Sequence, residues 1–210
     1  MDRQPDLSLA GLRDFEAQAI ADILPLLASG EEAAATAFVR LADTPVFSDA
    51  TSTALRVIGA EEDVHLALLT ALAGVLPPPD HNPGARHGSR VFHFSLTRGG
   101  AMLHLARIAA IDSAVCTILS RLLAKGTPIG NSAHLSRLFM RIRSDESRHV
   151  AVARHTISME PDRRALRDAG ASAREGLAVL LEPASAAFAS LGVDPDGLRR
   201  DMRGLPCGLL

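Results

Sequence analysis

Two short motifs in the sequence combine a carboxylate and an imidazole at the same spacing. Glu62 is followed three residues later by His65, and Glu146 is followed three residues later by His149. On an α-helix this spacing places both side chains on one face, one turn apart, where they can bind the same metal ion. One such pair arises easily by chance in a chain with eight histidines. Whether it indicates a metal site therefore depends on the residues that share its helical face.

Each motif lies on an apolar helical stripe. One stripe carries Ile58, Leu69 and Leu72, and the other carries Leu135, Leu138, Phe139, Ile142, Ala153 and Ile157. Both pairs are therefore expected to face a hydrophobic core. Burying an ionised carboxylate among aliphatic side chains costs several kcal/mol unless it is paired or bound to a metal. Metal binding accounts for this arrangement, and ion pairs between helices are the alternative.

Two further acids are predicted to face the same core. Asp112 is the only acidic residue between Asp80 and Asp145, and its helical stripe is otherwise aliphatic. Glu31 falls on the apolar side of its helix, whereas Glu32 lies about 100° away, toward solvent. We therefore prefer Glu31 as a ligand. The alternative is that Glu31 serves only as a favourable charge in the first turn of a helix.

The elements that must position these residues are all predicted to be helices, because apolar residues recur at intervals of three and four. The predicted helices span about 8–28 with a kink at Pro25, 31–43, 49–73, 100–125 and 133–159. Ser48 or Asp49 is expected to cap the third of them. Gly30 and Gly126 are expected to end the first and fourth.

The chain is expected to form one all-α domain over residues 1–210. The metal-binding bundle covers about 31–158, and one or two C-terminal helices follow within 160–204. Residues 76–98 are rich in Pro and Gly and are predicted to be irregular, a candidate lid or site loop. The two acids of the first helix pair lie fourteen and seventeen residues from Pro45, and those of the second pair sixteen and eighteen from Pro128, so all four can meet at one height.

Composition excludes several other classes of protein. The chain lacks Trp and Tyr, the usual platforms for stacking single-stranded nucleic acid, so no nucleic-acid partner is expected. Charged residues interrupt the longest apolar stretches and the N-terminus lacks a signal peptide, so we expect a cytoplasmic protein without a membrane span. Its two cysteines form no CxxC pair. Residues 81–144 carry nine basic residues and one acidic residue, which could attract an anionic partner or form solvated helix faces.

Two helices that each give an acid and two that each give Glu-x-x-His form the constellation of dinuclear carboxylate proteins. At this point the sequence resembles the ferritin-like diiron carboxylate superfamily. The segment DESRH at 145–149 is similar to the DExRH signature of bacterial diiron monooxygenases and ribonucleotide reductase radical subunits. The first motif departs from this signature, with Glu61 and Val64 at the Asp and Arg positions. Asp112 stands where most members have Glu.

The resemblance implies a ferritin-like four-helix bundle with additional N- and C-terminal helices. It implies that the metal ligands are Glu31, Glu62, His65, Asp112, Glu146 and His149. Asp145 would contact a ligand histidine from outside the metal site, and Glu61 and Arg148 are candidates for similar supporting contacts. The expected cofactors are two iron ions, or a manganese and an iron ion, with O2 as co-substrate.

The function that the resemblance implies is an oxygenase or oxidase acting on a small organic substrate by hydroxylation, N-oxidation, desaturation or C–C cleavage. An iron-storage ferroxidase and a hydroxylase of tRNA or another macromolecule are the alternatives. The absence of Tyr argues against a tyrosyl-radical subunit, and the absence of CxxC argues against a rubrerythrin. Electrons would come from an external donor such as a ferredoxin and its reductase, and a homodimer is compatible with the sequence.

Two residues near Asp112 are candidates for lining a substrate channel. His104 precedes Asp112 by about two turns, and Cys116 follows it by about one. A lone His or Cys on an apolar helix is more often part of the core, so the core alternative stays open for both.

Overall fold

The structure is a computed structural model that describes residues 9, 11–80, 83–158 and 160–205. Within these residues its regular secondary structure is entirely helical, which confirms the all-α prediction. The helices are α1 (Asp14–Ala42), α2 (Asp49–Ala73), α3 (Pro83–Leu96), α4 (Ala101–Leu122), α5 (Pro128–Asn131), α6 (Ala133–Ile157), α7 (Arg163–Leu180), the 3₁₀ helix η1 (Glu182–Ala184), α8 (Ser185–Ser190) and α9 (Pro195–Arg203).

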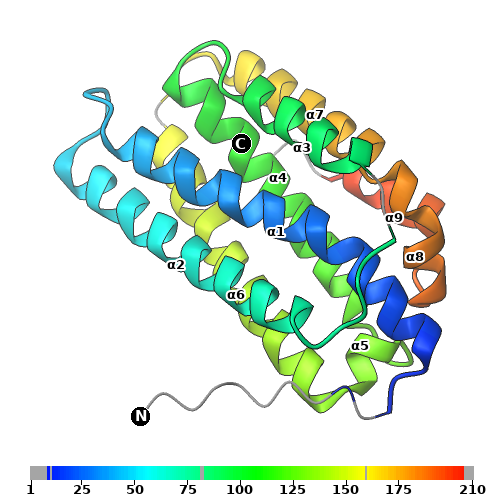
Figure 1. Cartoon of the computed structure of the whole chain (residues 1–210). Coiled ribbons are helices and arrows are strands. Elements are labelled where there is room, and N and C mark those ends of the chain that lie inside the picture. Colours follow the sequence, from blue (N-terminus) through cyan, green and yellow to red (C-terminus); the bar gives the residue numbers. More distant parts are fainter. Residues whose placement is uncertain (1–8, 10, 81–82, 159, 206–210) are drawn as a thin grey trace, which may run out of the picture.

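Four long helices form two antiparallel pairs. Helix α1 packs along α2, and α4 packs along α6, while further contacts join α2 to α6 and α1 to α4. Helix α3 carries the chain back along the molecule, so that α2 and α4 run in the same direction (Figure 1). Helices α7 and α9 pack against α4, and α8 packs against α1.

The hydrophobic core is divided into two apolar clusters, one toward each end of the four long helices. One contains Phe38, Leu41, Leu55, Ile58, Leu105, Ile108, Ala153 and Ile157, among others. The other contains Ile20, Ile23, Leu24, Leu69, Leu72, Ile118, Leu119, Leu122, Leu135, Phe139 and Ile142, among others. Each helix passes from one cluster to the other, and its predicted ligands lie in between. The clusters therefore fix the ligands at one height.

Helix α1 is continuous where the sequence predicted a break. It runs through both Pro25 and Gly30, and the backbone at Gly30 does not have a positive φ. Buried side chains lie on both sides of Gly30, including Leu24 and Phe38, so core packing holds the helix together across both residues. Helix α1 also begins at Asp14, and the predicted start near residue 8 lies outside the described residues.

The segment 76–98 is not irregular, because it contains α3. Ser89, Phe92 and Leu96 follow the spacing of a helix, with Ser89 and Leu96 buried and Phe92 packed against the core. A proline is tolerated in the first turn of a helix, so Pro83 begins α3 rather than preventing it. On α7, a Cβ at Gly176 would lie 2.8 Å from Phe92 Cε2, so the glycine provides the space that α3 needs.

The helix boundaries near the turns follow the predicted signals. The Ser48 side chain accepts a hydrogen bond from the backbone N–H of Thr51 and caps α2. Gly126 has a φ of 97°, a left-handed conformation that glycine adopts readily, in the turn after α4. Between residues 160 and 205, the described C-terminal part forms three α-helices and η1 rather than one or two helices.

Helix α4 is long and apolar enough, by length and composition, to cross a membrane. The sequence prediction concerned uncharged runs, and Arg107, Asp112 and Arg121 do interrupt this helix. More than half of its apolar window, 56%, is buried inside the structure. A core helix satisfies the same test, and α4 packs against α6 and α7.

Candidate metal centre

The six predicted ligands lie in the layer between the two apolar clusters, and hydrogen bonds or ion pairs join five of them, all but Asp112. Helix α1 supplies Glu31, α2 supplies Glu62 and His65, α4 supplies Asp112, and α6 supplies Glu146 and His149. None of the six is more than 7% exposed. Each lies on the same helical stripe as the aliphatic side chains around it, so the packing that buries the stripes also buries the polar groups.

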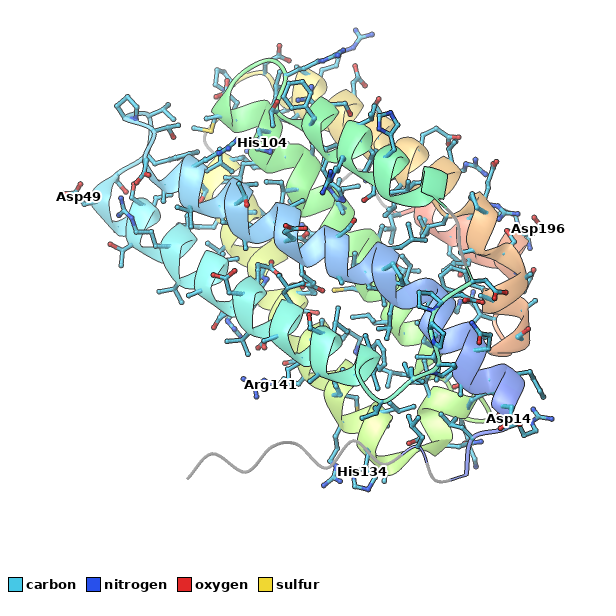
Figure 2. All side chains as sticks on the ribbon, viewed as in Figure 1. Asp14, Asp49, His104, His134, Arg141 and Asp196 are labelled. Atoms are coloured by element: carbon cyan, nitrogen blue, oxygen red, sulfur yellow. The ribbon has the colours of Figure 1, made fainter. Side chains whose placement is uncertain are left out.

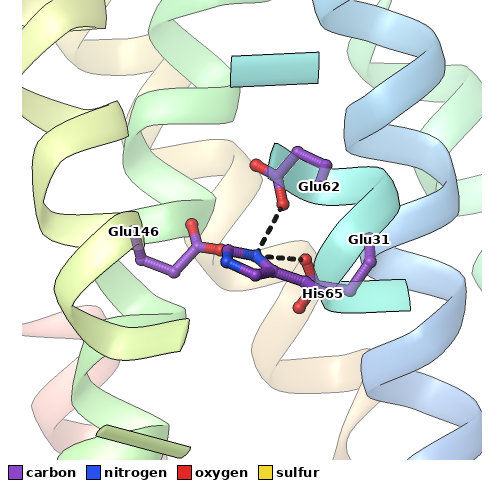
Figure 3. Close-up of side chains that lie close together, drawn as sticks. All are labelled: Glu31, Glu62, His65 and Glu146. Atoms are coloured by element: carbon purple, nitrogen blue, oxygen red, sulfur yellow. Dashed lines mark hydrogen bonds and ion pairs between the residues drawn. The ribbon is translucent and has the colours of Figure 1, made fainter. Parts of the chain in front are cut away.

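His65 is surrounded by three glutamates. Its Nδ1 lies 3.3 Å from Glu31 Oε2, 3.3 Å from Glu62 Oε2 and 3.4 Å from Glu146 Oε1. In this group of four residues, one possible ligand atom from each lies within 4.8 Å of the others, close enough to hold a metal ion. Figure 3 shows the four side chains converging from α1, α2 and α6.

His149 lies on the other side of Glu62 and Glu146 from His65. Its Nδ1 lies 3.0 Å from Glu62 Oε1 and 3.6 Å from Glu146 Oε2. Asp112 is buried within the electrostatic field of Glu146 and Glu62. Glu62 and Glu146 therefore each present one oxygen toward His65 and the other toward His149. This arrangement suits two neighbouring ions that share both glutamates.

The buried polar atoms of the cluster fit metal binding. Asp112 Oδ2 is buried and makes no hydrogen bond with any described residue, and the buried atoms Glu62 Oε1 and His149 Nδ1 form an ion pair at 3.0 Å. Buried polar groups without hydrogen bonds are rare in folded proteins and call for a partner. Four carboxylates and two imidazoles are also donors that iron and manganese accept, and four negative charges match two divalent ions.

Protons can balance the charge of the cluster when no metal does. Burial would lower the pKa of His65, but hydrogen bonds to the surrounding glutamates outweigh burial and raise this pKa to about 12. The pKa of His149 is likewise raised, to about 11, because its interactions with Glu146 and Glu62 outweigh burial. Burial and neighbouring carboxylates raise the pKa of Glu31 and of Asp112 well above their usual range. A metal ion must displace such protons to bind.

The outward-facing nitrogens of the two histidines contact carboxylates from the opposite motif. His65 Nε2 lies 3.1 Å from Asp145 Oδ2, and His149 Nε2 lies 2.9 Å from Glu61 Oε2. Arg148 donates to both carboxylates, at 2.9 Å to Asp145 Oδ1 and 2.7 Å to Glu61 Oε1. Metal-binding histidines usually donate their second N–H to a carboxylate in this way, which fixes the ring orientation.

The sequence signals for these outer contacts were incomplete. The resemblance implied a contact between Asp145 and a ligand histidine, but it did not indicate which one. It also gave no reason for one arginine to serve both motifs. Two features of the sequence could have indicated these contacts. Val64 leaves the first motif without an arginine of its own, and Glu61, which is longer than the Asp of the signature, can reach across to Arg148 on α6.

The remaining predicted residues lie at different distances from the cluster. Glu32 is exposed, as its helical phase predicted. The Cys116 thiol lies 3.6 Å from Ser147 Oγ, and burial raises its pKa to about 11, so it stays protonated near the cluster. His104 is buried, and burial together with the charges of Arg107 and Arg40 lowers its pKa to about 4. Among the described residues, no hydrogen bond or ion pair joins His104 to the six predicted ligands.

A cavity of about 550 Å³ opens at one end of the molecule, away from the cluster. It is lined by the start of α1, by the segment around α5 and by the end of α8, and includes Arg13, Glu16 and Asn131. Glu16 lies fifteen residues before Glu31 on α1, which is roughly 22 Å along the helix. This cavity is therefore not part of the candidate metal centre.

No protein-family model matches the chain, and a search of curated proteins finds no match. The interpretation of the site consequently rests on its own geometry and chemistry.

Proposed function

We propose that the protein is a ferritin-like dinuclear-iron oxidoreductase, an oxygenase or oxidase that uses O2 to oxidise a small organic substrate. The observation that carries the proposal is the placement of Glu62 and Glu146 between His65 and His149, with each glutamate facing both histidines. A buried site of this composition is costly to maintain as a purely structural element. A pair of metal ions makes its composition understandable.

The helix arrangement supports a ferritin-like interpretation. Ferritin-like bundles contain two antiparallel helix pairs joined by one long crossover. Here α3 and its flanking turns connect α2 to the far end of the molecule, where α4 begins (Figure 1). The additional helices α7, α8 and α9 pack outside the four helices that supply the cluster.

The residues divide between two metal positions in this proposal. Glu31 and His65 would hold one ion, Asp112 and His149 would hold the other, and Glu62 and Glu146, which face both histidines, would contribute to both positions. Bound iron would supply redox chemistry and O2 activation. The chain's own residues hold the ligands in fixed rotamers, and the two apolar clusters exclude water from both ends of the site.

The proposed partners and location follow from the same chemistry. The chain contains no CxxC pair and no tyrosine, so electrons would come from a separate donor such as a ferredoxin and its reductase. The substrate would be a small molecule, and the reaction a hydroxylation, N-oxidation, desaturation or C–C cleavage. A manganese–iron pair is the alternative metal content, and the proposed location is the cytoplasm.

The experiment that tests this function is rapid mixing of the anaerobic ferrous protein with O2. We expect two irons per chain, fast consumption of O2 and a transient visible absorption. The His65→Ala/His149→Ala double variant, which removes a ligand from each position, is expected to show neither the consumption nor the absorption. Iron that remains ferrous in the presence of O2 would contradict the proposal.

A storage ferroxidase is the second candidate, and one observation favours it. The segment between α2 and α4 contains a helix rather than the irregular loop that the sequence predicted, and ferritin-like bundles join their helix pairs by one long crossover. Size-exclusion chromatography during aerobic iron loading separates the two functions. A 24-subunit particle that accumulates many irons per chain would establish storage, whereas uptake that stops at two irons supports the oxidoreductase.

A further inference from the structure

The two candidate ligand histidines are joined on their outer side by one arginine. Arg148 donates to Glu61 and to Asp145, and each of these carboxylates uses its second oxygen to contact a histidine. We propose that Arg148 is a positioning residue that couples the two metal positions, so that an ion bound at one position favours binding at the other. The inference rests on the proposed dinuclear site and adds a way for its two halves to communicate.

The guanidinium group is well suited to hold two carboxylates at a fixed separation. Its nitrogens lie in one rigid plane, and here two of them donate at 2.9 Å and 2.7 Å to oxygens of two different residues. Asp145 belongs to α6 and Glu61 to α2, so Arg148 also joins these two helices across their seam. The five residues His65, Asp145, Arg148, Glu61 and His149 form a continuous series of contacts, and a rotation of either histidine ring would break one of them.

The coupling depends on one arginine because the first motif has none. Val64 occupies the position that corresponds to Arg148, and its side chain is 42% exposed. Among the described residues, Arg148 is the only arginine or lysine that forms an ion pair with Glu61. Asp145 has a second neighbour, because Arg141 Nε lies 3.9 Å from its Oδ2. The orientation of His149 therefore depends on Arg148 more than the orientation of His65 does.

This series of contacts transmits side-chain ordering from one metal position to the other. When His65 is fixed by an ion at Nδ1, its Nε2–H is directed at Asp145 Oδ2. Asp145 then holds Arg148, and Arg148 holds Glu61 where it accepts from His149 Nε2. The second ion meets an imidazole that is already oriented, so less conformational freedom is lost on binding. Such coupling is reciprocal, and either ion can be bound first.

The test is a titration of the metal-free full-length chain with Co²⁺, followed by calorimetry and by the visible absorption of bound Co²⁺. We expect the wild-type chain to bind two ions cooperatively. Arg148→Gln is expected to bind the first ion but to bind the second about 10–100-fold more weakly, the usual effect of removing a residue that supports a ligand. Arg148→Lys keeps the positive charge but lacks the planar guanidinium group that donates to two carboxylates, so it is also expected to lose cooperativity.

Arg137→Gln is the matched control, because Arg137 lies on the same helix, one turn from His134 (Figure 2), and its side chain donates to Ala133 O and contacts His134 Nδ1 rather than Glu61 or Asp145. It is expected to bind both ions as the wild type does. Circular dichroism verifies that each variant keeps its helices. Unchanged affinities and cooperativity in both Arg148 variants would overturn the coupling while leaving the dinuclear site intact. A wild-type chain that binds one ion or none would overturn the coupling together with the site.

Discussion

Glu31 and Glu32 are adjacent in the sequence but lie in opposite environments. Glu31 is 7% exposed and contacts His65, whereas Glu32 is exposed. We predict that Glu31→Gln weakens metal binding or the reaction with O2 at least tenfold, because it removes a charged ligand, while Glu32→Gln has little effect. Calorimetric metal titration of the two variants measures the difference. The reverse ranking would mean that α1 is rotated relative to its position in the structure.

Asp112 makes the two proposed metal positions unequal. Its side chain is one methylene shorter than that of Glu31, which reduces its reach by roughly 1.3 Å. The small side chains of Ala109 and Ser113 permit close packing of α4, but Asp112 Oδ2 still has no hydrogen-bond partner among the described residues. A carboxylate with shorter reach holds its ion more loosely.

We therefore predict that the ion at Asp112 is lost first when the protein is treated with a mild chelator. Stepwise chelation followed by metal analysis and spectroscopy of the remaining ion tests this order. Asp112→Glu is expected to reduce the difference between the two positions. Equal rates of loss from both positions in the wild-type chain would contradict the prediction.

Two glycines lie in, or pack against, the helical segments that the sequence did not predict. At Gly30, an added Cβ would have no neighbour within 4 Å, so Gly30→Ala is expected to stabilise the continuous helix α1 by about 0.5–1 kcal/mol. At Gly176, an added Cβ would lie 2.8 Å from Phe92 Cε2. Overpacking of this kind costs about 1–3 kcal/mol, which is more than helix propensity returns, so Gly176→Ala is expected to destabilise the protein.

Thermal or urea unfolding of the two variants provides the measurement. Because both substitutions are the same change in a helix, each serves as the control for the other. A destabilised Gly30→Ala variant would indicate that α1 bends at this glycine. A stabilised Gly176→Ala variant would indicate that α3 does not pack on α7 as described.

The parts of the fold that the sequence predicted correctly are those that a single helical stripe determines. The phase of Glu31, the cap at Ser48 and the turn at Gly126 all depend on a few neighbouring residues. Continuity of α1 and the existence of α3 depend instead on tertiary packing. Local signals from Gly30 and from the prolines of 76–98 favour interruption, and contacts with other helices outweigh them.

The same distinction applies to the site. The burial of all six candidate ligands followed from helical phase, because each polar residue shares a stripe with aliphatic ones. The contacts of Glu61 and Asp145 with the histidine of the opposite motif could not be derived in this way. They depend on the rotation and separation of α2 and α6, which sequence periodicity does not determine.

Two apolar clusters with a polar layer between them fill the interior between the four long helices. The clusters bury the four long helices above and below the ligands, so removal of a ligand should leave the helices intact. His65→Ala and His149→Ala are each expected to lose at least one metal ion per chain with little change in circular dichroism. Full metal occupancy in both variants would exclude these histidines as ligands.

Anomalous X-ray diffraction from crystals of the iron-loaded protein can determine whether the polar layer holds two ions that share Glu62 and Glu146. Data collected on both sides of the iron absorption edge locate each ion without reference to the protein atoms. We predict two anomalous peaks about 3.5–4 Å apart, the usual separation in two-metal sites, with both glutamates between them. A single peak, or two peaks that Glu62 and Glu146 do not share, would contradict a dinuclear site formed by these residues.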